Sequence, residues 1–172
     1  MAVWAIIEPL LTTWKVAMRP MLIPVVMLTA FVLTGCSIKQ TVTPVALSTT
    51  QSPEICMIPA EGLRAGFNTT YTAQLRSKGF HTRELPSGSP PASCALSTTY
   101  IGKWSWDLAL YMTFADIQVF ENGHRVGQAL YDATWGGGRP DKFISAQNKI
   151  IEMTNQLFPN AAYGAAQTTN FP

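Results

Sequence analysis

The dipeptide Asn122-Gly123 restricts the possible folds of this chain more than any other feature. It separates Tyr111–Glu121 from His124–Trp135, two segments in which apolar and polar residues alternate as in half-buried strands. Asn-Gly suits a two-residue β-turn because both central residues of that turn need positive φ. The sequence therefore predicts a β-hairpin of two antiparallel strands.

A two-residue loop also predicts which residues of the hairpin face one another. It places Val119 opposite Val126 and Ala115 opposite Leu130. These four residues and Ile117 would then lie on one face of the hairpin, which we expect to be in the core.

A βαβ unit is predicted before the hairpin. The apolar run Glu54–Ile58 lies between two prolines and is typical of a buried strand, and Phe80–Leu85 predicts a second strand. Between them, apolar residues recur every four positions and predict the buried face of a helix that Gly79 ends: Leu63, Phe67, Tyr71 and Leu75. We expect the two strands to be parallel.

Two further elements complete the predicted domain. Cys94–Trp106 is rich in β-branched and aromatic residues and predicts another strand. Asp141 is the expected N-cap of a last helix, whose apolar stripe holds Phe143, Ala146, Ile150 and Leu157. The sum is an α+β fold (an α/β sandwich): a βαβ unit, a strand, a β-hairpin and a C-terminal helix, with a mixed sheet of about five strands and two helices.

The N-terminal part of the chain has the pattern of an export signal. Met21–Leu33 is almost entirely apolar, with a length that suits a signal-peptide core and is short for a membrane span. Arg19 supplies a positive charge before this run, and the small residues Thr34 and Gly35 follow it. Cys36 comes next, and from there the chain turns polar.

The run Leu33-Thr34-Gly35-Cys36 resembles the lipobox of bacterial lipoproteins. The resemblance implies that a signal peptidase cuts between Gly35 and Cys36, and that the sulfur and the new amine of Cys36 are acylated. The resemblance thus implies three acyl chains. Three chains would anchor the protein firmly, since two membrane-binding signals already suffice for stable anchoring. Ser37, where aspartate would imply retention at the inner membrane, favours the periplasmic face of the outer membrane. The periplasmic face of the inner membrane is the alternative.

The chain divides into four parts on this interpretation. A compact signal begins at Met18, which we expect to be the true start, with Met1 as the alternative. A flexible tether would span roughly 22 Å, although Val42–Leu47 could form a short edge strand. The expected parts are a signal peptide over 1–35, the lipidated cysteine and tether over 36–53, the α/β domain over 54–158 and a disordered tail over 159–172.

The chain has three cysteines, and two remain after Cys36. Cys56 and Cys94 both lie on predicted core strands, and the chain carries an export signal. That context suggests a disulfide between them. The alternative is two buried free thiols.

The sequence contains little that indicates catalysis. The formal net charge of +2 gives no broad field that would attract nucleic acid, and no histidines and cysteines have the spacing of a zinc site. We therefore expect no metal, no cofactor and no enzymatic activity. An enzyme would need His81 or His124 beside Asp107, Asp116 or Asp132 in a cleft.

Aromatic residues gather on one side of the predicted sheet. Alternation places Trp104 and Trp106 on the same side of a strand end, and Phe114, Phe120 and Tyr131 on the hairpin face away from the predicted core. A face that mixes aromatic and polar residues is typical of a surface that binds a partner. The other interpretation, which we favour, is that these residues form a core beneath the loop after Trp106 and beneath Trp135.

The chain is similar to the Sbal-type lipoproteins of Gram-negative bacteria over about residues 54–158. The likeness rests on a Val/Ile-Cys strand and on Pro90-Pro91-Ala92-Ser93-Cys94, Trp106-Asp107, Tyr111-Met112, Ala115-Asp116-Ile117, Asn122-Gly123, Ala129-x-Tyr131, Gly136-Gly137 and Lys142-Phe143. The resemblance implies an envelope lipoprotein, adds weight to the pairing of Cys56 with Cys94, and implies no reaction.

These observations predict a membrane-anchored periplasmic lipoprotein that contacts another envelope component without catalysing a reaction. Its expected partners are the membrane, through the lipid anchor, and an envelope protein. The alternative function is a module that binds a small or cell-wall ligand through the aromatic face of the sheet.

Overall fold

The structure, a computed structural model, describes residues 38–47, 54–137 and 140–159. The predicted signal peptide, Cys36 and the predicted tail beyond Pro159 lie outside the described residues. Within the described ranges, no helix combines the length and the apolar character that a membrane span requires.

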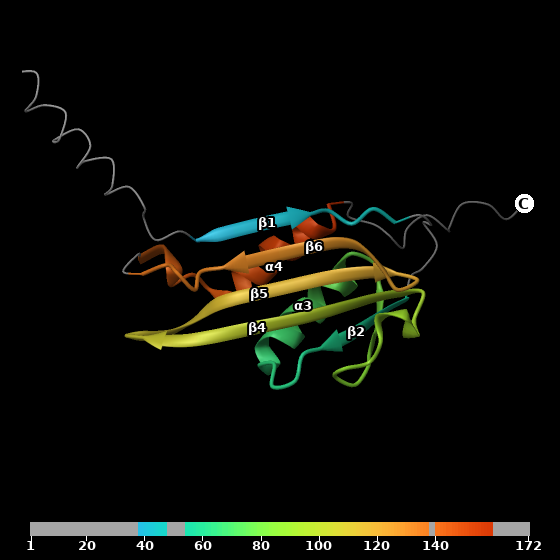
Figure 1. The fold of residues 1–172 in the computed structure, drawn as a ribbon, viewed down its shortest axis with the longest axis horizontal. Helices are drawn as coiled ribbons and strands as arrows, with labels where there is room; N and C mark the ends of the chain where they lie inside the picture. The colour runs from blue at the N-terminus through green and yellow to red at the C-terminus, as the bar shows by residue number, and fades with distance from the viewer. Residues whose placement is uncertain (1–37, 48–53, 138–139, 160–172) are drawn as a thin grey trace, which may run out of the picture. The chain divides into compact units, whose positions relative to one another are not determined.

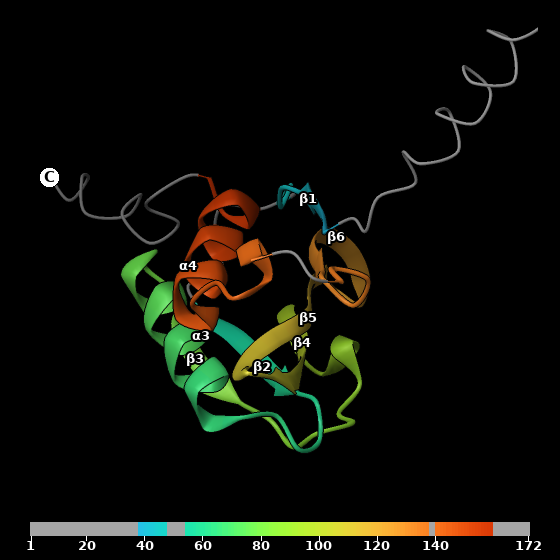
Figure 2. The same cartoon turned by 90° about the vertical axis from the view of Figure 1, so that its left-hand side faces the viewer.

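One mixed sheet of six strands forms the domain, in the order β1-β6-β5-β4-β2-β3 (Figure 1). Two helices pack on one face of this sheet (Figure 2). The predicted α+β class is confirmed, with one strand more than the expected five. The elements are β1 (Lys39–Thr43), β2 (Glu54–Pro59), α3 (Ala65–Ser77), β3 (His81–Glu84), η2 (Pro91–Ser93), β4 (Leu96–Asp107), β5 (Ala109–Glu121), β6 (His124–Asp132), η3 (Pro140–Lys142) and α4 (Ala146–Leu157).

The predicted βαβ unit is present as β2, α3 and β3. The two strands are parallel neighbours, with Glu54 beside His81, and β4 pairs with β2 in parallel on its other side. Helix α3 buries Phe67, Tyr71 and Leu75, the face that the four-residue spacing predicted. Gly79 follows the helix at a φ of 90°, a conformation that glycine adopts without strain.

The core lies between the two helices and the face of the sheet that they cover, which we call the inner face. Tyr71 on α3 contacts Tyr100 on β4, with ring centroids 4.9 Å apart. Helix α4 adds Ile150, Met153 and Leu157 to the same buried cluster. The opposite side of the sheet, which neither helix covers, is the outer face (Figure 2).

The hairpin between β5 and β6 turns at Asn122-Gly123, as predicted, and both residues have positive φ (51° and 81°). The predicted register is wrong by one residue. Val119 pairs with Gly127 and not with Val126, because the register shifts at a β-bulge between Val119 and Phe120. By the same shift, Ala115 pairs with Tyr131 and not with Leu130.

The last helix begins later than predicted. Asp141 lies in the short helix η3, and Ser145 is the N-cap of α4, where its hydroxyl accepts a hydrogen bond from the backbone N–H of Asn148 at 3.3 Å. Ile150 is buried on the predicted stripe, whereas Phe143 precedes the helix and is 40% exposed. The expectation failed because two capping residues lie close together, and only the second is followed by a helical stripe.

An edge strand forms within the predicted tether, and it begins at Lys39, three residues earlier than expected. β1 pairs antiparallel with β6 along its whole length. Val45 is buried, and its backbone N–H donates to the carbonyl oxygen of Leu157 over 2.8 Å. Part of the expected tether, residues 39–47, therefore lies against the domain, while residues 48–53 lie outside the described part of the chain.

The structure joins Cys56 on β2 to Cys94 through a disulfide, as predicted, with their Cα atoms 6.2 Å apart. Cys94 lies just before β4, at the end of η2. The bridge therefore fixes the start of β4 beside the strand with which it pairs.

Candidate functional site on the outer face and at the hairpin tip

The outer face carries a hydrogen-bonded polar network centred on Asp116 of β5. Gln118 donates from Nε2 to Asp116 Oδ2 over 2.6 Å, and Gln128 donates from Nε2 to Oδ1 over 2.8 Å. Arg125 donates to Gln128 Oε1 over 3.0 Å. These four side chains form a hydrogen-bonding surface in which no nucleophile is paired with a base.

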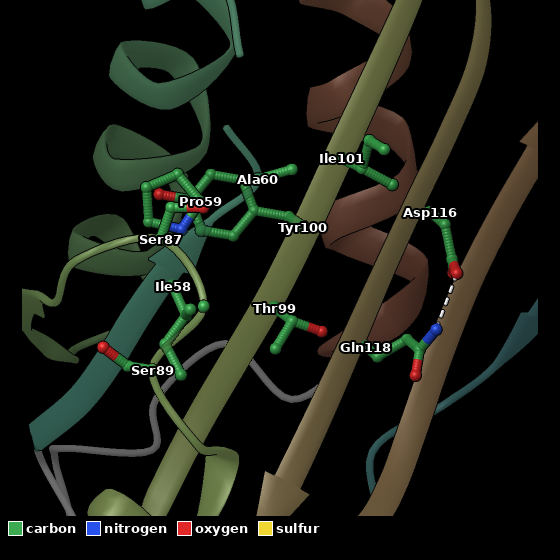
Figure 3. A pocket seen from close by; sticks show the side chains of 11 residues that line it. Ile58, Pro59, Ala60, Ser87, Ser89, Thr99, Tyr100, Ile101, Asp116 and Gln118 are labelled. Carbon is green, nitrogen blue, oxygen red and sulfur yellow. Dashed lines mark hydrogen bonds between the residues drawn. The ribbon is translucent and has the colours of Figure 1, made fainter. Parts of the chain in front are cut away.

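A hollow lies beside this network, between β2, β4 and β5 (Figure 3). Figure 3 shows Ser87 and Ser89 on one side, Asp116 and Gln118 on the other, and Thr99 between them. Its volume of about 210 Å³ is below the ~300–1,000 Å³ that is usual for small-molecule sites. The hollow therefore has room for a small ligand or for one end of a larger one.

The five aromatic residues of the predicted partner surface do not form one surface. Phe114 and Phe120 are half-buried on the outer face. Trp104 packs on the inner side against Phe67, with ring centroids 6.2 Å apart. Trp106 is on the same strand, nearer its end, and is 71% exposed.

Tyr131 was expected on the outer face and is instead in the core, with 1% of its surface exposed. The bulge in β6 is the reason, because one extra residue reverses the face of every side chain beyond it. Among the described residues, its hydroxyl has no hydrogen-bond partner. Burial raises the pKa of Tyr131, and the nearby Asp141 adds to this effect.

Five exposed apolar side chains come from two segments that meet at one end of the sheet, and we call these residues the tip cluster. Its members come from the hairpin that joins β4 to β5 and from the segment between β6 and α4. They are the large apolar side chains that are exposed among the described residues: Trp106 (71%), Leu108 (86%), Leu110 (50%), Trp135 (76%) and Phe143 (40%). Patches of this kind mark interaction surfaces more often than they occur by chance.

Leu108 forms the turn of this hairpin by itself, since Asp107 pairs with Ala109. Its φ is 60°, in the left-handed region that leucine adopts only at a cost. Glycine or asparagine would adopt this conformation with less strain. The residue is nevertheless a leucine, and its side chain is exposed to solvent. Such strain points to a function for the side chain.

Lys142 connects the two halves of the tip cluster. Its ammonium donates to Asp107 Oδ2 and to the carbonyl oxygen of Gly137, each over 2.5 Å, and only 5% of its side chain is exposed. The rings of Tyr111 and Phe143 lie 5.3 and 5.1 Å from the same nitrogen. The hydrogen bond to Asp107 raises the pKa of Lys142, so the charge that connects the two segments persists at neutral pH.

Sequence reasoning found Trp106 but missed the rest of the tip cluster. The run Asp107-Leu108-Ala109-Leu110 lies between the two predicted strands Cys94–Trp106 and Tyr111–Glu121, so its two leucines had no assigned strand face. Trp135 was placed at the end of the predicted strand His124–Trp135, whereas β6 ends at Asp132 and leaves Trp135 exposed. Leu108 and Leu110 were therefore detectable as apolar side chains without an assigned place in the core, whereas Trp135 was not.

The structure keeps the two histidines away from the carboxylates that a catalytic site would need. His124 is at the β5–β6 turn, whereas Asp107 and Asp132 are at the other end of these strands. His81 is on the edge strand β3, which β2 and β4 separate from Asp116. In the described part of the chain, no three histidine, cysteine, aspartate or glutamate side chains gather to hold a metal ion.

Comparison with known proteins gives a distant likeness in structure. No protein-family model matches the chain, and no curated protein matches it either. The PelC dodecamer from Paraburkholderia phytofirmans is similar at 12% identity and a TM-score of 0.49, over 73% of this chain and 99% of that one. A point-substituted PelC dodecamer from the same organism is similar at 11% identity and a TM-score of 0.47, over 73% and 98%.

Proposed function

We propose that the protein is a lipid-anchored envelope protein that acts by binding a partner in the periplasm. In this proposal Cys36 carries the acyl chains and Gly35 precedes the cleavage site. The residue after the cysteine, Ser37, favours the outer membrane over the inner one. The lipobox pattern and the apolar run before it support this proposal.

The observation that carries the proposal is the position of β1. This strand begins at Lys39, three positions after Cys36, so the extended chain between them spans at most about 11 Å. Gln40 on β1 donates to Glu152 of α4 over 2.8 Å, which fixes the strand to the domain. An acylated Cys36 would therefore hold the folded domain directly at the bilayer and not on a long tether.

Metabolic labelling tests the anchor. Cells that express the protein with radioactive palmitate should label it, and Cys36→Ala should remove the label. Ser37→Ala is the matched control, which should keep both the label and the outer-membrane fraction, while Ser37→Asp should keep the label and move the protein to the inner membrane. A native protein that takes up no palmitate would contradict the proposal.

The outer face is the surface that we assign to the envelope partner. Phe114 and Phe120 flank the Asp116 network there, and a face of half-buried aromatic and polar side chains is typical of protein interfaces. A photo-crosslinking residue at Phe120 should give one discrete adduct in intact cells. The same residue at Asn148, on the exposed side of α4, should give none, and equal adducts from both positions would argue against the assignment.

A second candidate function is the binding of a small or cell-wall ligand in the hollow of Figure 3. The Asp116 network at its rim favours this function, because it supplies hydrogen-bonding groups next to an apolar wall that includes Ile58 and Ile101. Soluble peptidoglycan fragments should then raise the melting temperature of the native protein and have less effect on Asp116→Asn. A screen without any stabilising fragment would count against this function.

A further inference from the structure

We infer that the tip cluster docks onto the surface of the bilayer to which the chain is anchored. This inference rests on the proposed function, because it takes Cys36 to be acylated. It assigns a second membrane contact, made by protein side chains, and thereby a fixed orientation of the domain on the membrane.

The strand register places the tip cluster and the entry of the chain at the same end of the sheet. One row of paired residues runs across four strands at this end: Lys39, Asp132, Phe114 and Lys103. Among the strands, only those of the β4–β5 hairpin continue beyond this row, from Phe114 to Ala109, over about 17 Å at the rise of an antiparallel strand. Figure 1 shows the hairpin extending past the start of β1.

The distances allow the anchor and the tip to meet one bilayer surface. The extended chain from Lys39 back to Cys36 reaches up to about 11 Å, and the acyl chains continue from there. The hairpin tip projects beyond the same row of residues by about 17 Å. A bilayer that holds the acyl chains of Cys36 therefore lies within reach of Leu108 at the turn.

The residues of the tip cluster have the chemistry of a membrane interface. Trp106 and Trp135 are amphipathic indoles, which are enriched at the level of the lipid headgroups. Leu108 and Leu110 are the apolar side chains that would enter the acyl region below them. The ammonium of Lys142 is covered by Phe143 and exposes little of its charge to the lipid, whereas the carboxylate of its partner Asp107 is half-exposed.

The anchor also favours the bilayer over other occupants of this surface. Once Cys36 is inserted, contact between the tip and the bilayer is an intramolecular event with a high effective concentration. The strained backbone of Leu108 fits this purpose, since it holds an apolar side chain, 86% exposed, at the turn of the hairpin. A second copy of the chain or an envelope protein would need to compete with the membrane at this position.

Quenching by brominated lipids tests the inference on the full chain. The lipidated protein would be reconstituted into vesicles of phosphatidylethanolamine and phosphatidylglycerol, with bromine on acyl carbons close to the headgroups. We expect these lipids to quench most of the emission from Trp106 and Trp135. The double variant Trp106→Phe, Trp135→Phe should lose this quenching, whereas the matched variant Trp104→Phe should keep it, because Trp104 packs against the core.

Leu108→Asn separates a membrane role from a structural one. Asparagine tolerates positive φ, so this variant should unfold at a higher denaturant concentration than the native protein. It should also show weaker quenching, because the polar side chain enters the bilayer less readily. A merely structural role for Leu108 would give the first effect without the second and would overturn the inference.

Each remaining outcome also decides the question. Protein that carries palmitate but shows no bromolipid quenching would overturn the inference and leave the proposed function intact. A photo-crosslinking residue at Trp106 that gives an adduct with a second copy or with another protein, in a protein without bromolipid quenching, would overturn it as well. Protein without palmitate would overturn the proposed function, and the inference with it.

Discussion

Tyr71 on α3 and Thr98 on β4 share a buried hydrogen bond of 2.8 Å between their hydroxyl oxygens. Thr98 donates its own proton to the carbonyl oxygen of Gln118 over 3.0 Å, so Tyr71 is the donor to Thr98. The helix, the central strand and its neighbour are thereby connected through one threonine. The side chain of Thr98 therefore fixes the position of α3 relative to β5, the strand that carries Asp116 and Gln118.

We expect Thr98→Val to lower the free energy of unfolding by about 1–3 kcal/mol, because the buried Tyr71 hydroxyl then has no acceptor. Thr99→Val is the matched control. It makes the same substitution at the next residue, on the outer face, and should change the stability little. Urea unfolding monitored by circular dichroism measures both, and equal midpoints for the two variants would refute the assigned hydrogen bond.

Tyr131 should behave in the opposite way from Tyr71, although both are buried tyrosines. Tyr131→Phe removes a hydroxyl that has no partner among the described residues, so it should leave the stability unchanged or raise it. Tyr71→Phe should cost about 0.5–1.5 kcal/mol, the usual net value of a hydrogen bond. Loss of stability in Tyr131→Phe as large as in Tyr71→Phe would show that its hydroxyl has a partner.

The protein should lose stability as the pH rises above about 10, where tyrosines of the unfolded chain begin to ionise. Burial raises the pKa of Tyr71 and of Tyr100, and the charge of Glu84 raises that of Tyr100 further. In this range the folded state keeps protons that the unfolded state releases, so unfolding becomes more favourable with increasing pH. Desolvation lowers the pKa of Lys78, which opposes the effect in part.

Urea unfolding at a series of alkaline pH values measures this slope. Each protected tyrosine contributes at most about 1.4 kcal/mol per pH unit. Tyr71→Phe removes one such group and should make the decline shallower. A slope identical to that of the native protein would mean that Tyr71 does not hold its proton.

Gly127 on β6 has no room for a side chain, because Val45, which follows β1, packs directly against it. A Cβ atom at this position would lie 2.6 Å from Val45 Cγ2 and 3.0 Å from Val45 Cα. We expect Gly127→Ala to lower the free energy of unfolding by about 1–3 kcal/mol through overpacking.

Gly66→Ala in α3 is the control, since a Cβ there meets nothing within 4 Å. This substitution should stabilise the helix by about 0.5–1 kcal/mol. Hydrogen exchange should locate the loss of protection in Gly127→Ala at β1, and uniform loss would argue against this packing.

The strand register around Gly127 is the part of the fold that the sequence could not predict. The spacing of apolar residues and the turn residues were sufficient to predict the hairpin and the βαβ unit, because both elements depend on local sequence patterns. The register failed because a bulge adds a residue without changing the turn, and a glycine inside a strand was its one local sign. Tyr131 was misplaced for this reason alone.

The tip cluster was missed for a different physical reason. Leu108 and Leu110 lie between the two predicted strands Cys94–Trp106 and Tyr111–Glu121, so the pattern assigned them to neither face of the sheet. Only the pairing of Asp107 with Ala109 shows that the turn occurs at Leu108, and both leucines are exposed at this end of the hairpin. The exposure of an apolar residue depends on where the strands end, and periodicity does not determine that.

Opening the disulfide should reduce stability through the unfolded state. The bridge joins residues 38 positions apart, and closing a loop of that length contributes about 4 kcal/mol in the chain-entropy model. Cys56→Ser, Cys94→Ser should therefore unfold at a lower urea concentration than the native protein. Dithiothreitol should lower the midpoint of the native protein and leave that of the double variant unchanged, because only the native protein has a bond to reduce. Equal midpoints for the native protein with and without the reductant would mean that these two thiols are not joined in solution.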